Sequence, residues 1–372
     1  MHTLKALPVS RLSSILSIVA AGLRDRFGLT RLAIGGGSAP ALLDHLFSGS
    51  ALKMRDLDLI LVADRVVERE LAHRIGSALD SPELTFLPRY VYPRKRSRGG
   101  SELWIAGWGL VWDALGIEVD LSIFHDAAAL EWNGLMNVDR ILIPLAKAAT
   151  FNELAGALLA TGSASAAEAA GLIEDRRGGY ASWVQRAPTI VAWSAIQSAP
   201  IECAIRIVRC CADKLRLEKL HPELEGPLRT AVLAGHERGD RFMRVRNLIK
   251  LLHDIRADIE LEMMHALGAF EHWLPAIGQI IERLGPGGLR SILAEAEKKR
   301  RADARYDKTV ASAGEQGGAE ESALRLEALL RHLQAAEREE LLAEIAVAEP
   351  TFASLVREQL TATESERGAH SL

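Results

Sequence analysis

Cysteine is scarce in this chain, whose 372 residues include only Cys203, Cys210 and Cys211. Three cysteines are too few for a disulfide framework, and their spacing does not fit a zinc knuckle. Net charge is scarce too, because 45 Lys and Arg are balanced by 49 Asp and Glu, which leaves −4. A globally basic surface for nucleic acid is therefore excluded, and any such contact would need a local basic patch. We expect a reducing location, the cytoplasm.

Long apolar runs are missing as well. The most apolar stretch near the N-terminus, Leu12–Leu23, is too short to cross a bilayer and leads directly into charged residues. Its apolar residues recur at helical spacing, so we predict a helix that begins near Ser10 and ends at Gly28. With 48% hydrophobic and 25% charged residues, the composition is that of a globular protein with two or three cores. No membrane partner is expected.

Composition and hydrophobic periodicity change along the chain and divide it into parts. Strand signals occur only in the first part, as short runs rich in branched residues at Leu32–Ile34, Leu57–Val62 and Gly116–Phe124. After about Leu142 the sequence is rich in Ala and Leu with helical periodicity, as in Ile201–Leu217, Leu248–Leu267 and Ala323–Ile345. Two glycine-rich segments, 285–288 and 314–318, would interrupt these helices, the second as a flexible linker. The sequence thus predicts an α+β fold, with a head that contains a sheet followed by an all-helical body.

A glycine-rich turn follows the first predicted strand. Gly35, Gly36, Gly37 and Ser38 lie between that strand and a helical pattern. Backbone N–H groups at the start of a helix face outward at the positive end of its dipole, which suits a phosphate. Such a turn can also serve only to let a helix pack closely on a strand. The turn alone does not decide between the two interpretations.

Two carboxylates share one face of the next predicted strand. Asp56 and Asp58 alternate with apolar residues, so their side chains point the same way. Glu118 and Asp120 share a face of the third predicted strand. Acids that face one way repel each other unless a cation lies between them, and hard oxygen ligands suit a divalent metal. Taken singly, Asp56 could cap a turn and Asp120 could lie on a solvated edge, but the ordered set favours a metal site.

This order of features resembles the polymerase β-like nucleotidyltransferases, in which a Gly-Gly or Gly-Ser turn precedes an Asp-x-Asp strand and a third acidic strand. Within that superfamily the chain is most similar to bacterial-type CCA-adding tRNA nucleotidyltransferases and poly(A) polymerases. Residues 171–179 resemble the family's linker between head and neck, and Ile201–Arg209 resembles its base-reading Glu-Asp-x-x-Arg segment. We accordingly expect a mixed-sheet nucleotidyltransferase head at 1–145, a helical neck and body at 146–285, and a helical C-terminal extension at 286–372.

The resemblance also implies a reaction and the residues that carry it. The carboxylates would hold two Mg²⁺ or Mn²⁺ ions: Asp56, Asp58 and Asp120, with Glu118 as the alternate third ligand. The nucleoside triphosphate would be bound by residues of the turn and the neck: Gly35, Gly36, Gly37, Ser38, Arg206 and Arg209. An acceptor hydroxyl, as at the 3′ end of a tRNA or other RNA, would attack the α-phosphorus and displace pyrophosphate.

The chain departs from the family pattern at three places. The Arg-Asp pair that normally follows the glycine turn is replaced by Ala39 and Pro40, and paired arginines are missing from Glu131–Leu142. In the base-reading segment the family's Asp is replaced by Cys203, while Arg206 persists. We therefore expect a changed substrate and weak discrimination among nucleotides. Two alternatives remain open: an RNA-binding or regulatory relative without catalysis, and nucleotidyl transfer to a protein or a small molecule.

A second candidate site lies between the two acidic strands, where basic and aromatic residues alternate: Arg89, Tyr90, Tyr92, Arg94, Lys95, Arg96 and Arg98, followed by Trp104 and Trp108. Basic side chains beside aromatic platforms could hold a single-stranded nucleic-acid end. A solvated hairpin with core tryptophans nearby explains the same residues equally well.

Overall fold

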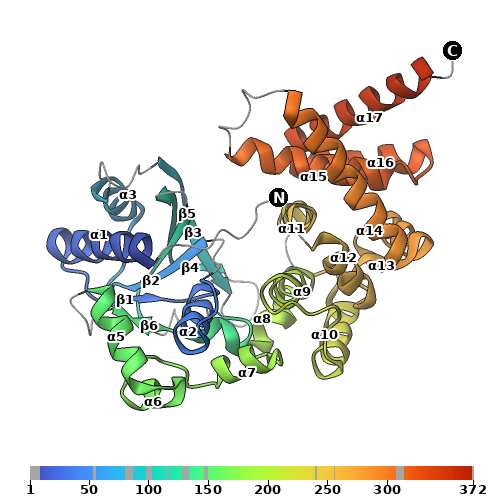
Figure 1. The fold of residues 1–372 in the computed structure, drawn as a ribbon. Helices are drawn as coiled ribbons and strands as arrows, with labels where there is room; N and C mark the ends of the chain where they lie inside the picture. Colours follow the sequence, from blue (N-terminus) through green and yellow to red (C-terminus); the bar gives the residue numbers. More distant parts are fainter. Residues whose placement is uncertain are drawn as a thin grey trace. The chain divides into compact units, whose positions relative to one another are not determined.

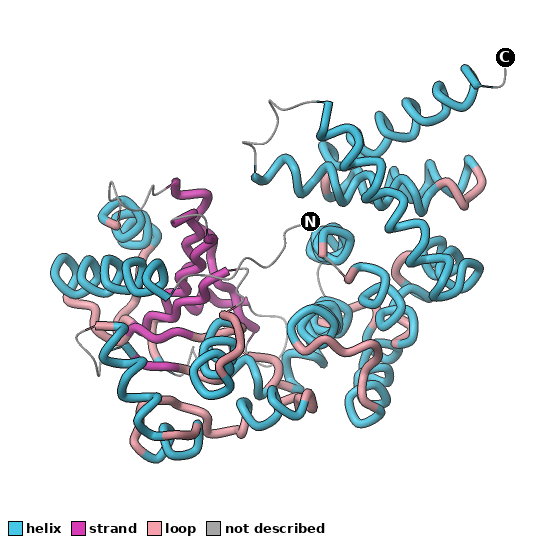
Figure 2. Tube along the Cα trace, in the orientation of Figure 1, coloured by secondary structure: helices cyan, strands magenta, loops and turns pink. Residues whose placement is uncertain are grey.

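The computed structural model describes residues 9–52, 56–79, 87–97, 103–114, 117–127, 134–145, 150–238, 241–254, 256–306 and 314–370. The chain divides by its contacts into two units, Met1–Trp193 and Ser194–Leu372. Within the described ranges every strand belongs to the first unit (Figures 1 and 2), which confirms the predicted α+β class. The sequence predicted three domains, with boundaries near 145 and 285. The two units do not test these boundaries, which stay a prediction.

The first unit combines one sheet with short helices. In chain order its elements are α1 (Val9–Phe27), β1 (Leu32–Ile34), α2 (Ser38–Ser48), β2 (Asp56–Val62), α3 (Arg69–Ala78), β3 (Leu87–Ser97), β4 (Leu103–Ala114), β5 (Ile117–Phe124), a 3₁₀ turn (Asn137–Arg140), β6 (Ile143–Pro144), α5 (Phe151–Thr161), α6 (Ala164–Ala169) and α7 (Gly179–Gln185). Helix α8 (Trp193–Ser198) begins at the division between the units. The predicted N-terminal helix is confirmed, and Gly28 ends it with a positive φ of 65°.

The sheet is mixed, with the strand order β3-β4-β5-β2-β1-β6. Strands β2 and β5 are parallel, and the other neighbours are antiparallel. The three strands expected from the sequence are present as β1, β2 and β5, within one or two residues of their predicted bounds. The sequence did not predict β3, β4 or β6.

The two faces of this sheet have different surroundings. Alternate residues of β2 and β5, such as Leu57, Leu59 and Leu121, join the main core together with residues of α1, α2, α3 and α5. Ile60 instead joins a small cluster on the opposite face with Phe124. Because strand side chains alternate, the acids at even positions of β2 and β5 lie on this second face, away from the main core.

The basic and aromatic segment forms the β3–β4 hairpin. Trp108 of β4 is buried, and its Nε1 donates a hydrogen bond of 2.8 Å to the backbone oxygen of Val67. Trp108 is therefore a core tryptophan. The basic side chains of this segment lie outside what the structure describes, so the nucleic-acid hypothesis for them stays a prediction.

The second unit is helical throughout its described part. Its elements after α8 are α9 (Pro200–Arg209), a π-helical turn (Cys210–Lys214), α10 (Pro222–Gly235), α11 (Arg241–His253), α12 (Ala257–Ala266), α13 (Ala269–His272), α14 (Pro275–Tyr306), α15 (Gly314–Leu330), α16 (Ala335–Ala348) and α17 (Pro350–His370). The predicted interruption at 285–288 is present as a kink in α14, where Gly285 has φ 62°. No helix of the described ranges is long and apolar enough to cross a bilayer.

The prediction of a flexible linker at 314–318 is wrong. These residues form the first turns of α15. Their glycines lead directly into a run of strong helix formers that packs against α11 and α14, and tertiary packing overrides the low helix propensity of glycine.

Candidate functional site

The acidic residues of the head come together because β2 and β5 are neighbours in register. Asp58 lies opposite Asp120, and Asp56 lies opposite Glu118. Residues opposite each other in a parallel pair point to the same face, and neighbouring strands are about 4.8 Å apart. All four side chains are half-buried. The structure thus places the four predicted acids on one face, as two cross-strand pairs.

The glycine turn is built around Asp58. The N–H of Gly37 donates to Asp58 Oδ2 at 3.0 Å, and the N–H of Gly35 donates to the Asp58 backbone oxygen at 3.0 Å. Gly36 has φ 53°, and a Cβ there would come within 2.2 Å of Asp58 Oδ2. Only glycine allows this approach together with this backbone conformation. The turn therefore fixes the carboxylate of Asp58.

Ser38 locks the same arrangement from the start of α2. Its hydroxyl donates to the backbone oxygen of Asp56 at 3.1 Å and accepts from the N–H of Asp58 at 2.9 Å. These two bonds connect the start of α2 to the end of β2 that carries the acids. The sequence suggested Ser38 as a nucleotide contact and gave no sign of this bridging role.

Four amides at the turn are engaged within the protein, those of Gly35, Gly37, Ser38 and Ala39. Besides the two that bond to Asp58, the N–H groups of Ser38 and Ala39 donate to the backbone oxygen of Gly35, each at 3.1 Å. Amides bonded in this way would have to exchange partners before they could hold a phosphate. The prediction that Gly35, Gly36, Gly37 and Ser38 bind the nucleotide thus stays a prediction, and the structure gives these residues a second role in positioning Asp58.

The carboxylates fit a divalent cation by their chemistry and their register. Carboxylate oxygens are the hard ligands that Mg²⁺ and Mn²⁺ take, and the pairs Asp58 with Asp120 and Asp56 with Glu118 offer four of them on one face. Among the described residues, no three His, Cys, Asp or Glu side chains are already gathered as a metal-binding group.

The predicted base-reading residues lie on α9 in the second unit. Arg206 is exposed. Cys203 is buried, and its thiol donates to the backbone oxygen of Ala195 at 3.4 Å. Glu202 forms an ion pair with Arg244 of α11 at 3.6 Å. Within this segment, Arg206 is the residue whose side chain is exposed to solvent.

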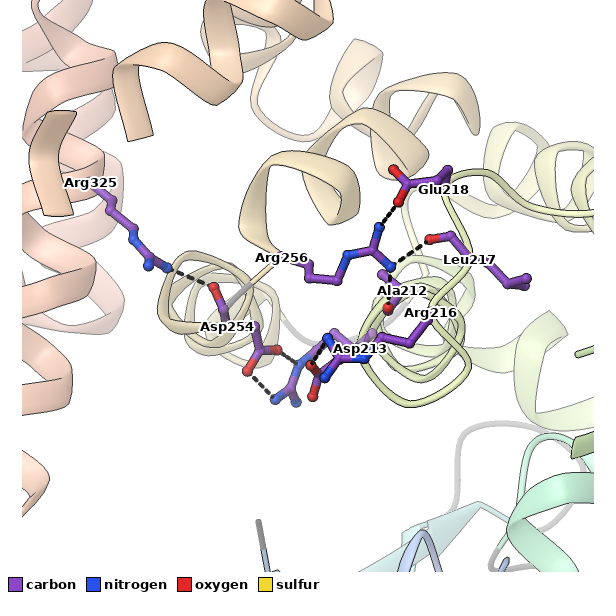
Figure 3. Close-up of polar contacts among 9 residues, drawn as sticks. Ala212, Asp213, Arg216, Leu217, Glu218, Asp254, Arg256 and Arg325 are labelled. Carbon is purple, nitrogen blue, oxygen red and sulfur yellow. Dashed lines mark hydrogen bonds and ion pairs between the residues drawn. The ribbon is translucent and has the colours of Figure 1, made fainter. Parts of the chain in front are cut away.

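Arg209, the other predicted nucleotide ligand on α9, is held by a buried carboxylate. Its Nε and Nη2 both donate to the carboxylate of Asp254, the second at 3.1 Å. The Asp254 side chain is 1% exposed, whereas that of Arg209 is 27% exposed. Figure 3 shows Asp254 together with Asp213 of the π-helical turn that follows α9. The sequence did not single out Asp254, because one acid after an apolar helix looks like a surface residue.

Charge is concentrated where α9 and α11 pack together. Burial lowers the pKa of Lys250 on α11, and the positive charges of Arg209 and Arg206 lower it further. Burial also raises the pKa of Glu260 on α12 to about 10, with Asp254 adding to the effect. Glu260 is therefore uncharged at neutral pH. Arg206 and Arg209 thus lie close enough to Lys250 to influence its charge, which groups three basic side chains where α9 and α11 pack together.

Comparison with solved structures identifies the fold. A tRNA-processing enzyme with CTP aligns with a TM-score of 0.54 and 15% identity over 94% of this chain and 79% of its own. A tRNA nucleotidyltransferase complexed with a primer tRNA and an incoming ATP analogue gives 0.54 and 15% over 94% and 84%. A CCA-adding enzyme with ATP gives 0.52 and 13% over 95% and 69%. No family model and no curated protein match the sequence. The predicted resemblance is thus confirmed at the level of the fold.

Proposed function

We propose that this protein is a metal-dependent nucleotidyltransferase that moves a nucleoside monophosphate from a nucleoside triphosphate to an acceptor hydroxyl at the 3′ end of an RNA. The observation that carries the proposal is the register of β2 and β5, which sets Asp58 opposite Asp120 and Asp56 opposite Glu118. This register occurs in a fold shared with structures described with CTP, ATP and a primer tRNA. These neighbours support a nucleotide and an RNA as the two substrates.

The chemistry requires charge neutralisation and positioning. Asp56, Asp58 and Asp120, with Glu118 as the alternate third ligand, would hold Mg²⁺ or Mn²⁺, which supplies neutralising charge to the triphosphate and lowers the pKa of the attacking hydroxyl. The acceptor oxygen forms a bond to the α-phosphorus, the bond from that phosphorus to the bridging oxygen breaks, and pyrophosphate leaves. The hydroxyl proton is released to solvent. No covalent intermediate on the protein is needed.

Hydrogen bonds within the protein hold Asp58 in place before substrate binds. The N–H of Gly37 and the hydroxyl of Ser38 fix Asp58 on β2, so less ordering remains to be done during the reaction. In the second unit, we propose that Arg206 contacts the base, since its side chain is exposed on α9. The positive charge shared by Arg206, Arg209 and Lys250 supports an anionic ligand there. We propose a cytoplasmic location for this reaction.

A second candidate function is RNA binding without catalysis. It is favoured by one observation, that Cys203 of the predicted base-reading segment is buried and donates to the backbone oxygen of Ala195. In that case the acids of β2 and β5 would be a remnant of the site and would not bind a metal with useful affinity.

One experiment distinguishes these functions. The protein is incubated with each α-³²P-labelled ribonucleoside triphosphate, Mg²⁺ or Mn²⁺, and total RNA, beside the Asp56→Asn/Asp58→Asn double variant. Label in RNA with the wild type and none with the variant supports the proposal. RNA that is retained by both proteins but never labelled supports the second candidate. Label in protein or in a small molecule means that the acceptor has changed.

A further inference from the structure

Asp254 and Arg256, at the turn between α11 and α12, bind the last residue of α9 and the segment that follows it. Asp254 binds the guanidinium of Arg209 at the end of α9. Arg256 donates through Nη1 to the backbone oxygens of Ala212 at 2.8 Å and Leu217 at 3.1 Å, and its Nη2 pairs with Glu218. The Arg209 guanidinium is therefore bound by a side chain of this turn, and Figure 3 shows Asp254 and Arg256 there.

An arginine of the C-terminal extension binds the backbone at this turn. Arg325 of α15 donates through Nη1 to the backbone oxygens of Leu252 at 2.6 Å and Asp254 at 2.7 Å. Carbonyl groups at the end of a helix lack intrahelical partners, and a cation there also meets the negative end of the helix dipole. Arg325 thus caps the C-terminus of α11 from another helix.

Arg325 is itself buried and oriented. It is 5% exposed, and its Nη2 pairs with Glu321 one turn earlier on α15 at 2.8 Å. On the same helix Ser322 donates to the backbone oxygen of Ile249 at 3.1 Å. A charged side chain is rarely buried unless it is paired and hydrogen-bonded, because desolvation is costly. These contacts form a chain from α15 through Asp254 to Arg209.

We propose that Arg325 is a positioning residue for Arg209: it fixes the backbone of Asp254, and the carboxylate of Asp254 then orients the Arg209 guanidinium. Asp254 occupies the Nε and Nη2 edge of Arg209, which leaves Nη1 hydrogens to donate to a ligand. The C-terminal extension, in which the sequence showed no function, would thereby complete the nucleotide-binding part of α9. This last consequence rests on the proposed function, whereas the orientation of Arg209 does not.

The first test reads the orientation of Arg209 without any activity. The Nε–H resonance of Arg209 is followed by NMR in full-length protein labelled with ¹⁵N-arginine, and Arg209→Lys assigns it. Arg325→Met removes all the donors of Arg325, and Arg325→Lys keeps the charge without the planar fork. Arg283→Met is the matched control, because exposed Arg283 of α14 also donates to a backbone oxygen, that of His332 at 2.7 Å.

We expect the Arg209 resonance to move toward that of free arginine in Arg325→Met, to move less in Arg325→Lys, and to stay unchanged in Arg283→Met. An unchanged Arg209 resonance in Arg325→Met overturns the proposal. If Arg325→Met fails to fold, Arg325→Lys decides in the same way, because its lysine cannot hold both carbonyls and Glu321.

The second test reads the consequence for the nucleotide. In the transfer assay, Arg325→Lys should raise the KM for the nucleoside triphosphate by about fivefold or more and change kcat by less than about twofold, since one oriented hydrogen bond is lost. A shifted Arg209 resonance with an unchanged KM contradicts a role in nucleotide binding. A wild-type protein without transfer activity disproves the proposed function and leaves the NMR result to decide the positioning role.

Discussion

At the scale of single residues, Asp58 combines a proposed role with an observed one. It is a candidate metal ligand opposite Asp120, and it accepts the N–H of Gly37 that fixes the glycine turn. An asparagine at this position keeps an oxygen that accepts this bond but carries no charge. Substitution by asparagine therefore separates the electrostatic task from the structural one.

We predict that Asp56→Asn and Asp58→Asn each weaken Mn²⁺ binding and leave the fold intact. Four carboxylates on one face repel each other without a cation, so the melting temperature of the metal-free protein should rise slightly in each variant. Calorimetric titration with Mn²⁺ and thermal melting in EDTA measure the two effects. If the double variant binds Mn²⁺ as tightly as the wild type, Asp56 and Asp58 are not metal ligands.

The third ligand is a choice between two residues on β5. Asp120 lies opposite Asp58, and Glu118 lies opposite Asp56, so both face the same side. We predict that Asp120→Ala lowers the transfer rate more than Glu118→Ala, because Asp120 is paired with the acid that the glycine turn holds in place. A larger loss for Glu118→Ala in the same assay would assign the ligand to Glu118.

Glu260 gives a prediction for stability that is independent of activity. Burial, with a contribution from Asp254, raises its pKa from 4.5 to about 10. Between these values the unfolded chain releases a proton that the folded protein keeps, so stability falls as pH rises, by up to about 1.4 kcal/mol per pH unit. Glu260→Gln removes this cost, and we expect it to melt near the wild-type temperature at pH 5 and above it at pH 8.

The control for this variant is Glu223→Gln on α10, whose side chain is exposed. It should leave the pH dependence of melting unchanged. If Glu260→Gln lowers the melting temperature at pH 8 as much as at pH 5, Glu260 is charged in the folded protein and burial does not raise its pKa.

At the scale of elements, the site depends on how closely the glycine turn approaches β2. We predict that Gly36→Ala destabilises the protein by about 1–3 kcal/mol and abolishes transfer, because its Cβ would lie 2.2 Å from Asp58 Oδ2 at a φ of 53°. Gly49→Ala is the matched control, since Gly49 has φ 72° and nothing within 4 Å of an added Cβ. It should cost stability through backbone strain and keep activity. Equal activity losses in both variants would argue against a special role for the turn.

The elements also show what the sequence could predict. The strands β1, β2 and β5 were predictable because branched apolar residues follow one another there, and the shared face of Asp56 and Asp58 follows from strand alternation alone. Strands β3 and β4 were not, because Pro88 and Pro93 interrupt the first and Gly107 and Gly109 interrupt the second.

Pairings between distant segments were beyond the sequence. Alternation cannot say that β2 and β5 are parallel neighbours, so the pairing of Asp58 with Asp120 needed the structure. The chain of contacts from Arg325 to Asp254 and Arg209 was hidden for the same reason. Its members are 45 and 71 residues apart, and charged residues in an amphipathic helix normally indicate a solvated face.

At the scale of the whole molecule, a fold shared with tRNA nucleotidyltransferases coexists with a changed residue in the segment predicted to read the base. Cys203 is buried against the backbone oxygen of Ala195, which leaves Arg206 as the exposed polar group of that segment. We predict that the protein uses two or more of the four ribonucleotides with efficiencies within about tenfold, since one hydrogen bond contributes roughly 0.5 to 1.5 kcal/mol. Steady-state kinetics with each triphosphate measures this. A thousandfold preference for one nucleotide would mean that other residues select the base.

The proposed function depends most on the acids of β2 and β5, which we propose hold the metal ions for nucleotidyl transfer. The most direct measurement is the initial rate at which label from α-³²P-ribonucleoside triphosphate enters RNA 3′ ends, with wild-type protein and with Asp58→Asn, at saturating Mg²⁺ or Mn²⁺. We predict a rate that depends on the metal in the wild type and a loss of about a hundredfold or more in Asp58→Asn, the order of magnitude of a lost charge-stabilising group. Equal rates in the two proteins, or label that enters RNA in the presence of EDTA, would contradict the claim.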